Sequence, residues 1–174
     1  VALVAVTAGW HIYTETGDPW MLGLIGLAEV LPYFCVAPFA GYLVDHLPRR
    51  KLGMVAAAGL AVTPLLLALL TLDLFDHGIW LLYLPIMLTG MVRAFLGPVY
   101  NALFARVLPR AQFARGASLG SIVFQSAMVL GPAIGGLLIK PLGIPGVFAL
   151  ASILALVVIV FLGRMGVTEP PQLL

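Results

Sequence analysis

Long apolar runs separated by short polar breaks make up most of the chain. The runs are continuous and do not alternate with polar residues, which excludes the strands of a β-barrel. A helix needs about 20 mostly apolar residues to cross a hydrocarbon layer of ~30 Å. Five runs therefore predict complete membrane-spanning helices, at residues 19–44, 52–72, 79–104, 116–139 and 145–162. The shorter run at residues 1–13 predicts the second half of a further spanning helix.

The composition places these helices in a membrane. Hydrophobic residues make up 62% of the 174 residues and charged residues only 9%, whereas soluble domains carry roughly 25% charged residues. Too few polar side chains are present to cover a soluble globule of this size. A soluble enzyme, a disordered chain and a nucleic-acid binder are therefore excluded, and we predict an all-α membrane protein.

The sequence offers little of the chemistry that catalysis or metal binding needs. Cys35 is the single cysteine, so there is no disulfide framework and no cysteine-rich metal site; we interpret it as apolar filler within a helix. Paired carboxylates, a histidine array or a serine–histidine constellation do not fall at one membrane depth. We therefore expect no enzyme activity, no metal and no cofactor.

Two local signals mark helix boundaries and set the domain limits. Asp18 followed by Pro19 is typical of a helix N-cap with proline at the first helical position, and a turn is expected near Lys140 and Pro141. We predict that residues 1–165 form an amino-terminal bundle of six transmembrane helices, the first truncated. Residues 166–174 would begin a cytoplasmic linker to a missing second half.

The basic residues gather in the breaks of one side of the membrane. The breaks after the second, fourth and sixth spans hold seven of them, namely Arg49, Arg50, Lys51, Arg106, Arg110, Arg115 and Arg164. The other side has Lys140 alone. By the positive-inside rule the seven-charge side is cytoplasmic. The three tryptophans support this orientation because they lie near the non-cytoplasmic ends of their helices, where an aromatic belt would place them: Trp10, Trp20 and Trp80.

A faint internal repeat relates the two halves of the bundle. A shift of 94 positions places Pro38 and Gly41 on Pro132 and Gly135, and Gly26 on Gly120. The same shift superposes the first span on the fourth and the third on the sixth. Because each unit has an odd number of helices, a true repeat must be inverted in the membrane.

Two charged residues lie deep within predicted spans. A charge at the centre of a bilayer costs about 2.5–3.5 kcal/mol on insertion scales, so Glu29 and Arg93 must face a wet cavity or a partner. A functional interpretation makes them a titratable carboxylate and an anion-binding or proton-linked arginine; the structural alternative is a mutual salt bridge.

Three neutral or weakly basic residues in spans are further candidates. His11 is either a proton carrier or an interfacial histidine. Asn101 and Gln125 either contact substrate or join helices through hydrogen bonds.

The fifth predicted span carries a stripe of small residues. Its members recur at intervals of four and seven positions: Gly116, Gly120, Ala127, Gly131 and Gly135. Such a stripe allows another helix to approach closely. Pro132 removes a backbone donor and weakens the helix locally, a combination that suits a helix that both packs and bends.

Three motifs resemble the signatures of the major facilitator superfamily, and they occur in the expected order. The loop motif G-x-L-x-D-R-x-G-R-R-x is matched at Gly41, Asp45, Arg49 and Arg50, with His46 and Pro48 as departures. The fourth-helix motif R-x-x-Q-G is matched at Arg93 and Gly97, with Leu96 in place of glutamine. The core of the fifth-helix antiporter motif, G-P-x-x-G-G, is matched at Gly131, Pro132, Gly135 and Gly136. Residues 23–32 and 98–120 resemble the bacterial branch that includes the enterobactin exporter.

This resemblance implies one half of a twelve-helix fold that works by alternating access around a central cavity. It implies that Asp45 contacts a helix of the other half, where a carboxylate favours a helix N-terminus, and that Arg49 and Arg50 form the cytoplasmic charge network of this gate. It also implies a link between Arg93 and proton coupling, and between the fifth-helix motif and the direction of exchange.

We therefore predict a multi-pass transporter of the bacterial inner membrane that exports small organic molecules in exchange for protons. Its partners would be the substrate, protons, the lipid bilayer and the carboxy-terminal six-helix half, with no nucleic acid. An uptake symporter of the same fold and a non-transporting membrane scaffold remain as alternatives.

Overall fold

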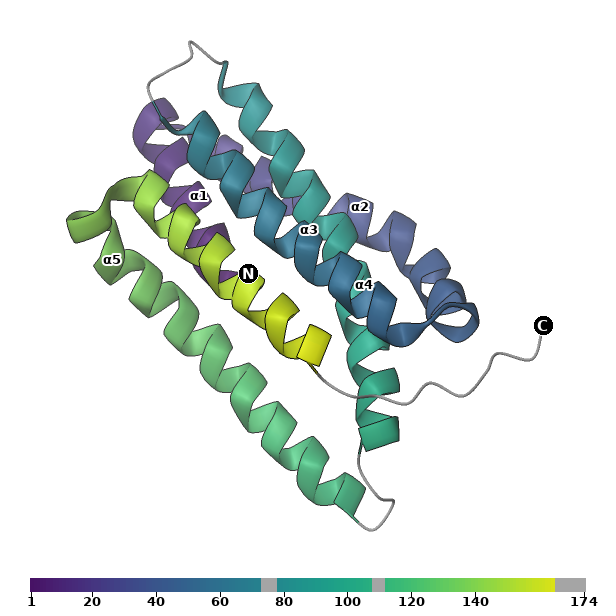
Figure 1. The fold of residues 1–174 in the computed structure, drawn as a ribbon. Coiled ribbons are helices and arrows are strands. Elements are labelled where there is room, and N and C mark those ends of the chain that lie inside the picture. The colour runs from purple at the N-terminus through teal and green to yellow at the C-terminus, as the bar shows by residue number, and fades with distance from the viewer. Residues whose placement is uncertain (73–77, 108–111, 165–174) are drawn as a thin grey trace.

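The computed structural model describes residues 1–72, 78–107 and 112–164, and every regular element within them is helical (Figure 1). The elements are α1 (Ala2–Thr16), α2 (Pro19–His46), α3 (Arg49–Leu70), the short 3₁₀ helix η1 (Ile79–Leu82), α4 (Tyr83–Val107) and α5 (Phe113–Arg164). The prediction of an all-α protein is confirmed. Within these described ranges, four stretches are long and apolar enough to cross a membrane: Pro19–His46, Lys51–Leu70, Ile79–Asn101 and Phe113–Arg164.

Helix α5 is broken at Gly143. A straight helix of its 52 residues would be roughly 78 Å long at 1.5 Å per residue, far more than the ~30 Å hydrocarbon layer. Gly143 instead adopts φ 68° and ψ 170°, and the chain folds back into two arms that run side by side (Figure 1). We call residues 113–142 the first arm and residues 144–164 the second arm.

The position of this reversal corrects the sequence-based expectation. Lys140 and Pro141 are helical, so the turn lies two residues beyond Pro141. The physical reason is backbone sterics, because a residue with a Cβ atom is strained at the positive φ of Gly143. Proline, by contrast, is tolerated within membrane helices.

Replacing Gly143 by alanine tests this assignment. We expect the substitution to lower the free energy of unfolding by about 1–3 kcal/mol, the usual cost of a residue held in a sparsely populated backbone region. Gly23→Ala is the matched control, because Gly23 is helical and an added methyl group there meets no atom within 4 Å. Thermal unfolding in detergent measures both; equal stability of the two variants would contradict the assignment.

The start of α2 follows the predicted capping pattern. Gly17 ends α1 at φ 63°, and the carboxylate Oδ1 of Asp18 accepts a hydrogen bond of 2.9 Å from the backbone N–H of Trp20. Pro19 occupies the first turn, where its missing N–H costs nothing. The N-cap prediction is confirmed.

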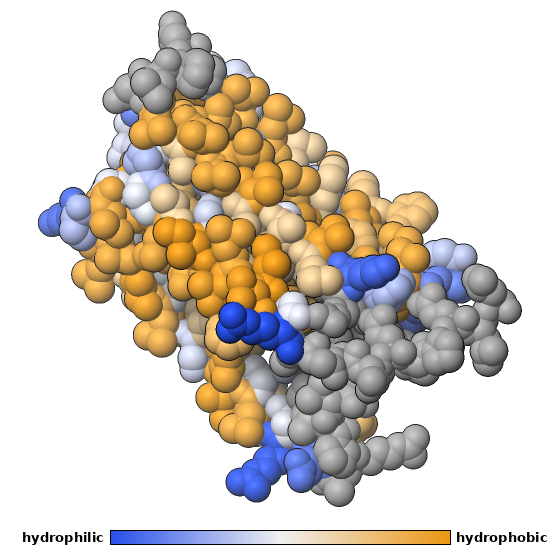
Figure 2. Space-filling model, in the orientation of Figure 1, coloured by the Kyte–Doolittle hydropathy of each residue, from blue (hydrophilic) through white to orange (hydrophobic). Residues whose placement is uncertain are grey.

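The core lies at the end of the bundle that holds η1. It joins α1, α2, α3, η1, α4 and the second arm of α5, and its most buried members include Ile12, Leu67 and Phe148. The phenolic hydroxyl of Tyr83 donates a hydrogen bond of 3.0 Å to the carbonyl of Met21, which ties α4 to α2. Elsewhere apolar side chains are exposed: orange residues cover the flanks of the helices in Figure 2, and blue residues lie at their ends.

The helix ends that carry basic residues lie together. The turn between α2 and α3, the start of α5 and the end of α5 point toward the same end of the bundle (Figure 1). Lys51, Arg115 and Arg164 are exposed there. Three further basic residues have side chains that lie outside the described part of the chain: Arg49, Arg50 and Arg106. Arg110 and the proposed linker at 166–174 lie wholly outside the described residues.

Candidate functional site

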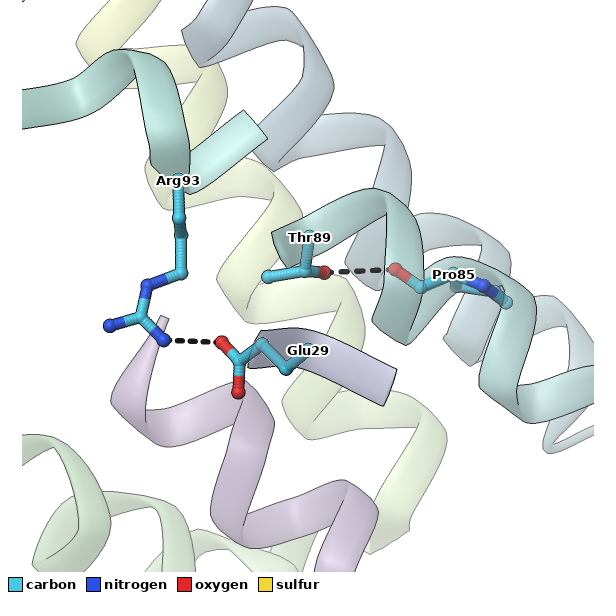
Figure 3. Close-up of polar contacts among 4 residues, drawn as sticks. All are labelled: Glu29, Pro85, Thr89 and Arg93. Atoms are coloured by element: carbon cyan, nitrogen blue, oxygen red, sulfur yellow. Dashed lines mark hydrogen bonds and ion pairs between the residues drawn. The ribbon is translucent and has the colours of Figure 1, made fainter. Parts of the chain in front are cut away.

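Glu29 and Arg93 form an ion pair between α2 and α4. Each residue lies ten positions beyond the first residue of its helix, which is roughly 15 Å along the axis. The two helices begin at the same end of the bundle (Figure 1), so equal offsets place the side chains at equal depth. The Arg93 guanidinium donates from Nη1 to the Glu29 carboxylate Oε1 (Figure 3). The sequence left a wet cavity and a mutual salt bridge open; the structure pairs the two residues.

The pair is buried unequally. The side chain of Arg93 is 39% exposed and that of Glu29 is 15% exposed. The carboxylate therefore depends on Arg93 for most of its stabilisation, whereas Arg93 retains access to the surface of the described chain.

Close contact between the two backbones brings the pair together. A methyl group added at Gly90 would lie 2.9 Å from the carbonyl carbon of Glu29 and would overlap its carbonyl oxygen. Gly90 is buried and lies one turn before Arg93 on α4. The neighbouring Thr89 is also buried, and its hydroxyl donates to the carbonyl of Pro85 at 3.0 Å (Figure 3). The Thr89 hydroxyl is therefore already paired within α4.

A large open cavity lies farther along α4, between that helix and the first arm of α5. Its volume is about 1010 Å³. Its described lining comprises Leu96, Gly97, Tyr100, Asn101, Ala117, Leu119, Gly120, Ser121, Val123, Phe124, Gln125 and Ala127. The candidates Asn101 and Gln125 thus share one cavity, and Gly97 joins it one turn beyond Arg93. Neither Glu29 nor Arg93 is among the described lining residues.

The remaining sequence candidates lie elsewhere. His11 is half-buried in α1 and is outside the described lining of the cavity. Near the end of α2, Gly41 is half-buried and Asp45 is exposed. The imidazole of His46 stacks on Tyr42 with ring centroids 4.1 Å apart, and its Nδ1 lies 2.8 Å from the Tyr42 carbonyl oxygen.

The glycines of the fifth-helix motif differ in their surroundings. A methyl group at Gly131 would lie 3.1 Å from Cβ of Ala2, and one at Gly135 would lie 3.3 Å from Cγ of Leu3. Helix α1 thus approaches the first arm of α5 at these two small residues. A methyl group added at Gly136 would meet no atom within 4 Å. Pro132, which lies between Gly131 and Gly135, is half-buried.

The structure adds site residues that the sequence did not single out. Gly90 allows the backbone of α2 to approach α4 closely. In the sequence, only its position one helical turn before Arg93 could have indicated this role. Tyr100 and Phe124 supply the aromatic walls of the cavity, and they were indistinguishable from lipid-facing residues. Among the described residues, no cluster of three or more His, Cys, Asp or Glu side chains is placed to hold a metal ion.

Comparison with known proteins agrees with the motifs. The family model of the Major Facilitator Superfamily matches residues 1–173. Relatives include Macrolide efflux protein A of Streptococcus pyogenes, 23% identical over 79% of this chain and 34% of its own length. The Multidrug efflux pump Tap of Mycolicibacterium fortuitum is 27% identical over 81% of this chain and 36% of its own length. The Quinolone resistance protein NorA of Staphylococcus aureus is 29% identical over 66% of this chain and 28% of its own length.

The chain spans about a third of the length of the curated relatives that it matches. The family model, in contrast, covers nearly every residue of the chain, from α1 through both arms of α5. On this evidence the protein belongs to the Major Facilitator Superfamily.

Proposed function

We propose that the protein is a secondary transporter of the bacterial inner membrane that exports small organic molecules in exchange for protons. The observation that carries this proposal is the pair of Glu29 and Arg93, a carboxylate and a partly exposed cation joined within apolar helices. A charge there is costly, and a proton can replace Arg93 as the partner of Glu29. The efflux names of the relatives support export rather than uptake.

The proposed cycle couples this exchange to alternating access. Protonation of Glu29 frees Arg93, one helical turn from the cavity that contains Asn101 and Gln125. Release of the proton restores the pair. We propose His11 as a further member of this polar set.

The gate and the fifth-helix motif belong to the same proposal. Asp45 would serve as the cytoplasmic gate, together with Gly41, Arg49 and Arg50, on the side of the basic turns. Gly131 and Gly135 would let the first arm of α5 move against α1 while keeping contact with it. Pro132 would supply the bend, because it removes a backbone hydrogen bond from that arm.

We also propose six transmembrane helices arranged as two inverted three-helix repeats, forming the amino-terminal half of a twelve-helix fold. The contacts support this arrangement: α2 packs on α4, and α1 packs on α5. An inverted repeat that exchanges the first helix with the fourth and the second with the fifth requires these two contacts to be equivalent. The resemblance of residues 23–32 and 98–120 supports the enterobactin-exporter branch.

Inverted membrane vesicles that carry the native-length protein test the proposal. The vesicles receive an imposed proton gradient, and the uptake of a macrolide, a quinolone and the neutral aromatic amine N-phenylnaphthylamine is measured. We expect gradient-dependent accumulation of at least one compound, lost when an ionophore dissipates the gradient. Accumulation that is indifferent to the ionophore would contradict proton-coupled export, and accumulation only under the opposite gradient would indicate an uptake symporter.

A further inference from the structure

The cavity between α4 and the first arm of α5 has the size and lining of a small-molecule site. Ligand pockets usually measure about 300–1,000 Å³ and combine apolar walls with a few polar groups; this cavity, at about 1010 Å³, is at the upper end of that range. Its polar side chains come from both helices: Tyr100 and Asn101 from α4, and Ser121 and Gln125 from α5. The amides of Asn101 and Gln125 and the hydroxyl of Ser121 therefore offer hydrogen bonds to a ligand held between the helices.

The part of the lining that the structure describes is uncharged. Its described residues include no Asp, Glu, Lys, Arg or His. The nearest charge along α4 is Arg93, one turn before Gly97, and its guanidinium already pairs with Glu29. On α5, Arg115 lies two residues before Ala117 and is exposed. A charged ligand would leave water without gaining an opposite charge from the described lining, which is a heavy penalty in an apolar environment.

Aromatic rings could in principle favour a cation. Tyr100 and Phe124 line the cavity, and a cation over an aromatic face gains some energy. This gain is smaller than the cost of desolvating an unpaired cation, and the nearby positive charge of Arg93 opposes it further. The same rings stack well on a neutral aromatic ligand.

We propose that this cavity binds neutral amphipathic molecules that carry an aromatic ring and at least one hydrogen-bonding group. The amides of Asn101 and Gln125 offer both donors and acceptors. The inference deepens the proposed export function and rests on it for the identity of the cargo, although binding itself is measured without transport.

The position of Tyr100 depends on Gly120. A methyl group at Gly120 would lie 3.5 Å from Cζ of Tyr100 and would overlap the phenolic oxygen. Because that oxygen is the far end of a flexible side chain, the ring can move away, and it would move within the cavity. Gly120→Ala therefore provides a way to alter the cavity wall without removing any group.

Binding of matched fluorescent compounds to the purified native-length protein in nanodiscs tests the proposal. N-phenylnaphthylamine is neutral, anilinonaphthalene sulfonate is the same scaffold with a negative charge, and ethidium is a cation; empty nanodiscs give the lipid background. We expect saturable binding of N-phenylnaphthylamine at least about tenfold tighter than that of either charged compound. Equal affinities for the three compounds would overturn the proposal.

Two variants on one helix locate the bound compound. Ser121→Phe fills the cavity and should weaken binding of N-phenylnaphthylamine by about tenfold or more, and Gly120→Ala should change the affinity by a smaller factor. Ser118→Phe is the matched control, because Ser118 is exposed on the same arm and is outside the described lining. Equal binding by Ser121→Phe and Ser118→Phe would overturn the assigned site.

The binding experiment and the vesicle experiment test different proposals, so a negative result in one does not decide the other. Intact binding with no gradient-driven accumulation in vesicles would refute the export function and leave the ligand class standing. Gradient-driven accumulation that Ser121→Phe leaves unchanged would refute the site and leave the export function standing.

Discussion

Arg93→Ala should destabilise the protein by about 3 kcal/mol and abolish gradient-driven export. Breaking a buried pair costs roughly 3–5 kcal/mol when a charge is left without a partner, and the partial exposure of Arg93 places the cost at the low end. Glu29→Gln should cost only about 1 kcal/mol, because it leaves behind the more exposed member, 39% against 15%. Export should be lost in both variants. Unfolding in detergent and transport in vesicles measure the two effects.

Exchanging the two charges separates a coupling role from a structural one. The double variant Glu29→Arg, Arg93→Glu restores opposite charges at equal depth and should recover much of the lost stability. It should not recover export, because the carboxylate then lies on α4 and no longer on α2. Full export by the double variant would indicate that the two residues merely pair, as in a scaffold. Glu15→Gln, on the exposed end of α1, serves as the control and should change neither property.

Gly90→Ala should produce the second large effect, by forcing α2 away from α4. The added methyl group would overlap the Glu29 carbonyl oxygen, and backbone does not yield as a flexible side chain does. We expect a loss of about 1–3 kcal/mol from overpacking, despite the gain of about 1 kcal/mol that alanine usually brings to a helix. Unfolding in detergent measures the net change.

A matched control and a double-mutant cycle identify the cause of this loss. Gly97→Ala lies on the same helix and meets no atom within 4 Å, so it should not destabilise the protein. If Gly90 positions the ion pair, then Arg93→Ala in the Gly90→Ala background should cost much less than it costs alone. Strict additivity of the two free energies would show that Gly90 does not act through the pair.

The length and continuity of the apolar runs predicted most of the fold. The apolar runs predicted the long helices to within a few residues, and Asp18 with Pro19 marked the start of α2, because capping chemistry is local. The reversal in α5 was less accessible. Proline dominated the sequence signal near Pro141, whereas the conformation that turns the chain depends on the φ angle of Gly143.

The sequence predicted that Glu29 and Arg93 need either a partner or water, but it did not predict how the two side chains are arranged. In the predicted spans 79–104 and 19–44, Arg93 lies fourteen residues from the start of its span and Glu29 ten. In the structure α4 begins at Tyr83, after the 3₁₀ turn of η1. With that start the two residues have equal offsets. The close approach at Gly90 and the cavity wall at Phe124 could not be predicted, because they depend on which helices become neighbours, and apolar side chains facing lipid or protein look alike in a membrane sequence.

Infrared difference spectroscopy of Glu29 tests the central claim most directly, since that claim is the exchange of a proton for Arg93 at this carboxylate. Spectra of the protein in bilayers are recorded between alkaline and acid pH, for the unmodified protein and for Glu29→Gln. We predict that a protonated-carboxyl band grows on acidification. In Glu29→Gln this band should be smaller by the contribution of one carboxyl group. Identical difference spectra for the two proteins would mean that Glu29 stays bound to Arg93 as a carboxylate throughout, and would contradict proton exchange at this site.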